Sequence, residues 1–413
     1  MTWLPEWRVT VGDDVYTNVT SVSYSTGRLD IDRQATAGYC RVEIVNTTGA
    51  EFTINVTEPV TLELKNSSGI YVKVFAGEVS DFNIGVRSPE ESGFITTGTI
   101  LGIGALSKLA KAIYNTALAE GLDGAQIALI LGAALNLSWA EVTPTDTWAT
   151  YPADVTWADA ESYVGDVDSG FYTMISQSAS ATAKSQTLVD QIANSALGQI
   201  YETADNKVNY DDADHRSNYL AANGYVALDG GYATPSTISS TTQTARIRNS
   251  LIYKYGTGYA STYSVSDSDS IASYGLFEKS FESNIKNLAD ITDIGTREIN
   301  LRKTAKASLG SITFRLDNQD MPNSMRDSLI GVFFGMPVII TNLPSNLLGG
   351  TFEGFVEDIT LKATPTYVDL TLYITATEFS LSTTQWETAI PSSTIWSGVT
   401  GTLIWNNATG AIA

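Results

Sequence analysis

Cysteine and histidine are almost missing from this chain of 413 residues, which contains one of each. The single Cys40 excludes an internal disulfide. It lies at an apolar position of an alternating segment, so we expect it to be buried as a small hydrophobic side chain. Basic residues are also scarce: 24 Lys and Arg stand against 45 Asp and Glu, which gives a net charge of −21. This balance argues against a nucleic-acid-binding surface, because such surfaces neutralise phosphates with Lys and Arg.

Lysine and arginine are absent between Ala112 and Ala183, a segment that contains nine acidic residues. These carboxylates have no bases nearby in the sequence with which to pair. We therefore expect them to face solvent, water-filled space or a basic partner, and a solvated acidic surface is the favoured interpretation.

A long uninterrupted hydrophobic run is also missing. The apolar stretch from Ile100 to Leu137 is broken by two lysines and two acidic residues, so we expect no membrane span. The first eight residues show no basic segment followed by an apolar one, and we expect no signal peptide.

One motif occurs twice, near the two ends of the chain. A Pro-Val pair lies 16 residues before the phenylalanine of the first copy and 15 residues before that of the second. Further upstream, Cys40, Val42 and Ile44 alternate in the same way as Ile312, Phe314 and Leu316. Three matched blocks in one order indicate that a single β-module is used twice. The residues of the repeated motif are Phe75, Gly77, Val79 and Asp81 in the first copy and Phe352, Gly354, Val356 and Asp358 in the second.

Apolar and polar residues alternate through most of the first hundred positions and again over residues 367–376. This pattern predicts short strands joined by polar turns, over 8–11, 19–24, 39–45, 60–64, 71–75, 79–86 and 367–376. Helices are predicted over 105–119, 125–135, 185–197 and 283–306, and a hairpin over 198–210. The fold class that follows is mainly β with α+β insertions. Two similar β-barrel or sandwich modules flank an α+β middle region.

These patterns predict four regions. The first β-module covers 1–98, an acidic α+β middle domain covers 99–245, and the second β-module with an inserted helix covers 246–379. The remaining residues, 380–413, show little regular pattern, and we expect an extended tail that binds another protein.

Six of the eight tryptophans form two regularly spaced triplets. Flat aromatic side chains can stack on sugars, so a carbohydrate-binding or carbohydrate-active β-protein is one interpretation. The other is that the tryptophans are anchors that contact a partner protein, and the polar, extended sequence around them favours this. The triplets are Trp139, Trp148 and Trp157, and Trp386, Trp396 and Trp405.

The residues that catalysis would require are few. His215 lies beside Asp211, Asp212 and Asp214, a combination that could bind a metal or act as a base, but a polar turn is the favoured interpretation. No Gly-x-Ser-x-Gly occurs, and Gly102-Ile103-Gly104 lacks the third glycine of a dinucleotide-binding loop. We therefore assign no catalytic residue, no cofactor and no metal. Paired carboxylates for glycoside hydrolysis stay open on residue type alone.

The order of several short motifs resembles that of phage minor tail proteins of the baseplate-hub type. The resemblance covers about residues 1–380 and excludes the tail. The matching segments are Cys40–Asn46, Phe75–Asp81, Gly102–Leu109 and the stretch through the first tryptophan triplet, Ser185–Tyr210, Asp269–Gly275, Leu329–Gly331 and Phe352–Asp358.

The resemblance implies a virion structural protein without catalysis at the distal end of the phage tail. Hub proteins of this family are trimers, and each chain supplies two tail-tube-like barrels to a pseudo-six-fold ring. Such a ring joins the six-fold tail tube, or other distal tail proteins, to a three-fold central fibre or spike. Double-stranded DNA would pass through its lumen without specific binding, and an acidic lining would keep the DNA from adhering.

Overall fold

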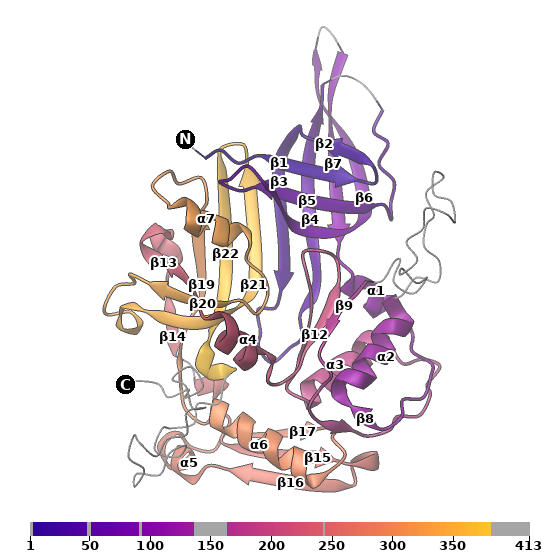
Figure 1. Cartoon of the computed structure of the whole chain (residues 1–413), viewed down its shortest axis with the longest axis vertical. Coiled ribbons are helices and arrows are strands. Elements are labelled where there is room, and N and C mark those ends of the chain that lie inside the picture. Colours follow the sequence, from indigo (N-terminus) through magenta and orange to yellow (C-terminus); the bar gives the residue numbers. More distant parts are fainter. Residues whose placement is uncertain (1–2, 48–50, 91–92, 136–162, 243, 381–413) are drawn as a thin grey trace.

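An extended, mainly antiparallel sheet forms one half of the molecule, and helices with short strands form the other (Figure 1). The computed structural model describes residues 3–47, 51–90, 93–135, 163–242 and 244–380. Two apolar cores are present, one along the large sheet and one among the helices. None of the helices in these ranges is long and apolar enough to cross a bilayer.

The large sheet has the hydrogen-bonded order β13, β20, β21, β3, β4, β7, β6, β5, β1 and β2, with β22 paired to β21 and β19 paired to β22. Among the described residues this pairing leaves the sheet open, so neither module is seen as a closed barrel. The strands are β1 (Trp7–Val11), β2 (Asp14–Tyr16), β3 (Val19–Gly27), β4 (Thr36–Asn46), β5 (Pro59–Lys65), β6 (Tyr71–Glu90), β7 (Gly93–Ile103), β13 (Val226–Asp229), β19 (Ser311–Arg315), β20 (Pro337–Thr341), β21 (Phe352–Thr364) and β22 (Tyr367–Ala376).

Side-chain alternation explains most of these strands. In β5, Val60, Leu62 and Leu64 are fully buried while their neighbours are at least partly exposed. Cys40 on β4 is 1% exposed, as expected of a small core side chain.

The prediction of two strands over 71–75 and 79–86 is wrong, because β6 continues through both. Gly77 between them is not a turn residue. It pairs with Val60 of β5, and a Cβ atom at Gly77 would lie 2.6 Å from the carbonyl oxygen of Ile103. The glycine therefore permits close approach of two strands rather than a change of direction.

The rest of the described structure contains most of the helices and four small sheets. Its elements are α1 (Leu106–Lys111), β8 (Gly121–Leu122), α2 (Asp123–Leu135), β9 (Val164–Val167), β10 (Thr173–Met174), α3 (Ser185–Ser195), β11 (Gln199–Glu202), β12 (Val208–Asp211), α4 (His215–Asn223), β14 (Ser240–Thr242), β15 (Ser250–Tyr255), β16 (Ser261–Ser266), α5 (Ser268–Tyr274), β17 (Glu278–Glu282), α6 (Leu288–Arg302) and β18 (Ala307–Leu309). A further helix, α7 (Asn323–Ile330), packs against the large sheet.

Two of the predicted helices are too long. Helix α1 ends at Lys111 because Ala112 is extended, and Ile113 then forms a strand-like bridge with Lys184. Helix α6 begins only after Asn287, whose side chain accepts the N–H of Asp290 and caps the helix. The hairpin predicted over 198–210 is confirmed by β11 and β12.

The residues of each apolar core do not follow the predicted domain boundaries. Leu251, Ile285 and Ile291 lie in the same core as Leu106 and Ile192, although the sequence pattern groups residues 246–379 with the second β-module. Strand β13 lies within the predicted middle domain, yet it pairs with β20 of the large sheet. The domain boundaries themselves stay a prediction.

Candidate functional site

Two four-stranded units within the large sheet have the same strand order. The first is β5–β6–β7–β4 and the second is β20–β21–β22–β19, and every pair within them is antiparallel. The register also matches: Val60 lies opposite Gly77 in the first unit, and Val338 lies opposite Gly354 in the second.

Both units contain a β-bulge at the same place. The β6–β7 register shifts between Val79 and Asp81, and the β21–β22 register shifts between Val356 and Asp358. Ser80 and Glu357 are therefore the residues at the bulge, where a strand bends and twists more strongly.

Most of the motif residues lie in the core or where two strands approach closely. Phe75, Val79, Phe352 and Val356 all belong to the core along the large sheet. A side chain at Gly354 would collide with the backbone oxygen of Thr375, as one at Gly77 would with that of Ile103. The two aspartates differ, because Asp81 is exposed and Asp358 is 9% exposed.

Glu357 lies at the centre of a fully buried ion cluster that sequence reasoning missed. Arg28 donates through Nε to Oε2 at 2.8 Å, and Arg216 donates to Oε1 at 2.6 Å and to Oε2 at 3.0 Å. The hydroxyl of Thr375 donates to Oε1 at 2.6 Å. Burial alone would raise the pKa of Glu357, but Arg216 and Arg28 outweigh it and hold this pKa far below its usual range.

This cluster joins three parts of the chain. Arg28 follows β3, Arg216 lies on α4, and Glu357 lies on β21. The backbone N–H of Arg28 also donates to the carbonyl oxygen of Glu357 at 2.7 Å. Gly27 permits this contact, because its φ is +112° and a Cβ atom there would collide with the same carbonyl oxygen.

A second buried carboxylate, Glu202 at the end of β11, connects the hairpin to the first unit. It accepts the backbone N–H groups of Gly38 on β4 and of Leu106 at the start of α1. Burial raises the pKa of Glu202 to about 7, although both hydrogen bonds act in the opposite direction.

His215, the single histidine, begins α4 and contacts two carboxylates. Its Nδ1 lies 2.7 Å from Oδ2 of Asp168 and 3.6 Å from Oδ1 of Asp211. One ligand atom from each of these three residues lies within 4.8 Å of the others, a spacing that would suit a metal ion. The oxygens already have protein partners: Asp168 Oδ2 accepts the N–H of Asp212, and Asp211 Oδ1 accepts the hydroxyl of Tyr201, each at 3.0 Å. Contacts within the protein therefore account for the close approach of these three side chains.

The other acidic neighbour, Asp214, points elsewhere and pairs with Arg297 at 2.7 Å. Burial raises the pKa of Asp211 to about 6, while His215 lowers it. Asp168 and Asp211 therefore lie near His215 Nδ1, whereas Asp214 pairs with Arg297 instead.

The prediction that the carboxylates of the acidic segment face solvent, water-filled space or a basic partner is wrong for Asp123. It is fully buried at the start of α2, and its Oδ1 accepts the backbone N–H groups of Phe171 and Tyr172 at 2.7 and 2.8 Å. The hydroxyl of Tyr210 donates to its other oxygen. Neutral donors satisfy this charge, so no base is needed.

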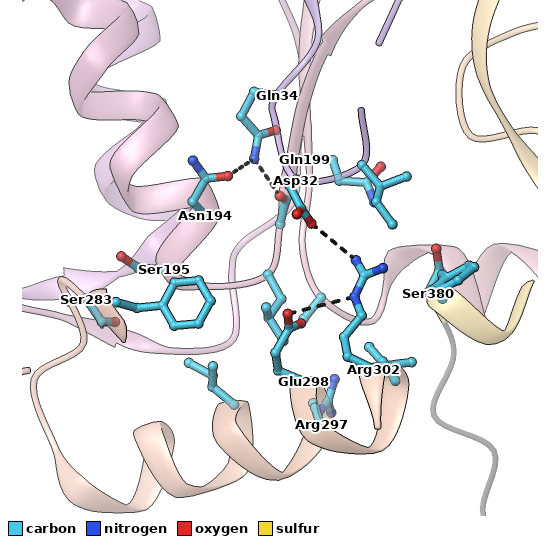
Figure 2. A pocket seen from close by; sticks show the side chains of 18 of the residues that line it. Asp32, Gln34, Asn194, Ser195, Gln199, Ser283, Arg297, Glu298, Arg302 and Ser380 are labelled. Atoms are coloured by element: carbon cyan, nitrogen blue, oxygen red, sulfur yellow. Dashed lines mark hydrogen bonds and ion pairs between the residues drawn. The ribbon is translucent and has the colours of Figure 1, made fainter. Parts of the chain in front are cut away.

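A cavity of 410 Å³ lies where the loop after β3, the end of α3 and helix α6 meet. Figure 2 shows Gln34 hydrogen-bonded to Asn194, with Arg302 extending from α6 toward Asp32 and Glu298. This is the most strongly charged of the cavities described here, and sequence reasoning did not predict it.

The six tryptophans predicted to contact a partner all lie outside the described residues, as do residues 381–413 of the predicted tail.

Comparison with solved structures finds two similar tail proteins. The 43 kDa tail protein of prophage MuSo2 from Shewanella oneidensis is 10% identical, with a TM-score of 0.56 over 91% of this chain and 99% of that one. The tail protein from Neisseria meningitidis MC58 is 11% identical, with a TM-score of 0.59 over 91% of this chain and 98% of that one. No family model and no curated protein matches the sequence. The likeness shows that this chain shares the fold of these proteins.

Proposed function

We propose that this chain is a structural, non-catalytic component of a phage tail that forms the hub at the distal tip. The observation that carries the proposal is the pair of four-stranded units with one strand order, one register and one bulge position. The similar folds belong to tail proteins, which supports a tail role here.

Two equivalent units per chain give three chains six similar modules. A ring of this kind presents a pseudo-six-fold face to the tail tube or to distal tail proteins, and a three-fold face to a central fibre or spike. The duplication of one module within the gene is the simplest origin of the matched units.

Open sheet ends fit such an assembly. The path of the large sheet ends in β2 on one side and β13 on the other, and unpaired strand edges invite pairing with another chain. Neighbouring subunits in a ring would cover such edges.

The charge of −21 suits a channel that DNA crosses without adhering, if the acidic side chains line the lumen. In this proposal DNA is cargo and not a ligand. The virion, at the distal end of the tail, is the proposed location.

Native mass spectrometry of the purified protein tests the assembly. We expect a species three times the 44.3 kDa mass of one chain, persisting on dilution. A monomeric mass as the only species would contradict the proposal. Binding to a polysaccharide that is lost in Trp148→Ala or Trp396→Ala, but kept in the buried control Trp3→Phe, would favour the carbohydrate alternative instead.

A further inference from the structure

The cavity in Figure 2 has a charge opposite to that of the chain. Its lining contains six arginines and lysines against four carboxylates, whereas the whole chain carries almost twice as many acidic as basic residues. Three of the six already pair with carboxylates outside the lining: Arg28 and Arg216 with Glu357, and Arg297 with Asp214. Arg248, Lys279 and Arg302 are the cations that remain.

On the side of the cavity formed by α6, three cations share two carboxylates. Arg248 pairs with both Asp32 and Glu298, and it lies closer to these carboxylates than Arg302 or Lys279 does. Arg302 lies 3.7 Å from Asp32 and 3.8 Å from Glu298, beyond hydrogen-bond distance. Lys279 reaches Asp32 only at 3.8 Å. One positive charge is therefore not compensated within this group.

Arg302 is the buried member of this group whose guanidinium is incompletely hydrogen-bonded. It is 7% exposed, and its Nε has no hydrogen-bond partner among the described residues. Burial lowers the pKa of Arg302, and Arg248 adds to this effect while Glu298 opposes it. Leaving a buried guanidinium N–H without a hydrogen-bond acceptor is costly, so an acceptor supplied by a ligand would be favoured.

The surroundings strengthen the local positive charge. The ring of Phe379 lies 5.0 Å from the guanidinium carbon of Arg302, 5.6 Å from that of Arg246 and 5.5 Å from Nζ of Lys306. One Nη of Arg246 is likewise buried without a partner in the part of the chain that the structure describes. The carboxylate of Glu378 lies 3.9 Å from Nζ of Lys306 and offsets part of this charge. The remaining like charges repel each other, which favours an anion among them.

We propose that this cavity binds an oxyanion, a carboxylate or phosphate group, through Arg302 with Arg248 and Lys279 beside it. A guanidinium presents parallel N–H groups that match two oxygens of such a group. The oxyanion belongs either to a small free molecule or to an acidic side chain of a neighbouring protein. This inference goes beyond the proposed function and does not depend on it.

Isothermal titration calorimetry on the full-length protein, at constant ionic strength, tests the site. The probes are inorganic phosphate, succinate and a hexaglutamate peptide, with chloride as the reference anion. We expect at least one probe to bind with a Kd below about 10 mM and to raise the melting temperature accordingly. Tighter binding of the peptide identifies a protein segment as the source, and tighter binding of phosphate or succinate identifies a free anion.

The variant Arg302→Leu should weaken binding of that probe about tenfold or more, and Lys279→Gln should weaken it about threefold. The matched control is Arg33→Leu, since Arg33 lies on the same loop as Asp32 but its side chain is 83% exposed. Should Arg302→Leu not fold, Lys279→Gln decides. The proposal is overturned if no probe binds, or if neither cavity variant binds more weakly than the wild-type chain and Arg33→Leu.

Discussion

The two four-stranded units share a strand order and a bulge, yet the residues at their bulges meet opposite environments. Ser80 in the first unit is exposed, whereas Glu357 in the second is fully buried between Arg28 and Arg216. The scaffold is thus repeated but its surroundings are not. The bulge residue of the first unit is exposed to solvent. The bulge residue of the second unit binds arginines from helix α4 and from the end of β3, and it connects both to the sheet.

The largest loss of stability should come from removing the buried carboxylate at the second bulge. Glu357→Ala leaves two buried guanidinium groups without their acceptor, and we expect it to lower the free energy of unfolding by about 3–5 kcal/mol. Ser80→Ala, the same position of the first unit, should cost less than about 0.5 kcal/mol. Urea denaturation of both variants measures the difference, and similar losses in the two would refute the account of the cluster.

A smaller effect tests what the units have in common. Gly77→Ala and Gly354→Ala should each cost about 1–3 kcal/mol, because each new methyl group meets a backbone oxygen of the adjacent strand. Gly121→Ala is the control, since nothing lies within 4 Å of a Cβ atom there. Thermal unfolding compares the three variants. A loss in only one of the two motif variants would argue against equivalent roles.

The pH dependence should distinguish two buried carboxylates. Glu202, which contacts the first unit, has a pKa raised to about 7 from an ordinary value of 4.5. Between these two pKa values Glu202 keeps its proton in the folded state but loses it in the unfolded chain. The free energy of unfolding that Glu202 contributes therefore falls as the pH rises. Glu202→Gln should make the free energy of unfolding depend less steeply on pH in this range.

For Glu357 the pH dependence of stability has the opposite sign, because folding lowers the pKa of this carboxyl group. Its contribution is present above the ordinary pKa of 4.5 and is lost as the pH falls below that value. Unfolding free energies measured from about pH 3 to pH 8 should therefore show Glu202→Gln altering the upper part of the curve and Glu357→Gln the lower part. Unchanged slopes in both would contradict these assignments.

Local patterns in the sequence predict the strands well where one face is buried. Alternation in β5 and over Tyr367–Ile374 of β22 corresponds to buried side chains at every second position. The same reasoning wrongly divided β6, because glycine is a common turn residue and close approach of two strands leaves no local signal.

Long-range contacts were beyond prediction for a similar reason. Strand β21 pairs with β3 over Asp358–Ala363, which joins the two units into one sheet, and nothing near either strand indicates this. Arg28, Arg216 and Glu357 are also distant in sequence. One available signal was not used: the repeat aligns Glu357 with Ser80, and a charged residue at a matched strand position merits a search for its partner.

Side chains in the middle region show how context overrides composition. A segment without bases predicts solvated carboxylates, but Asp123 is buried and satisfied by backbone N–H groups and a tyrosine. Hydrogen-bond donors on the main chain are invisible to a count of charges.

The proposed ring of three chains requires that the two units of each chain occupy equivalent positions in it. An electron cryo-microscopy reconstruction of the purified protein or of the tail tip, computed without imposed symmetry, tests it directly. We expect a closed ring of three chains in which the units containing Gly77 and Gly354 alternate at equal radius. Units at different radii, or a ring with only one of them lining it, would contradict the account.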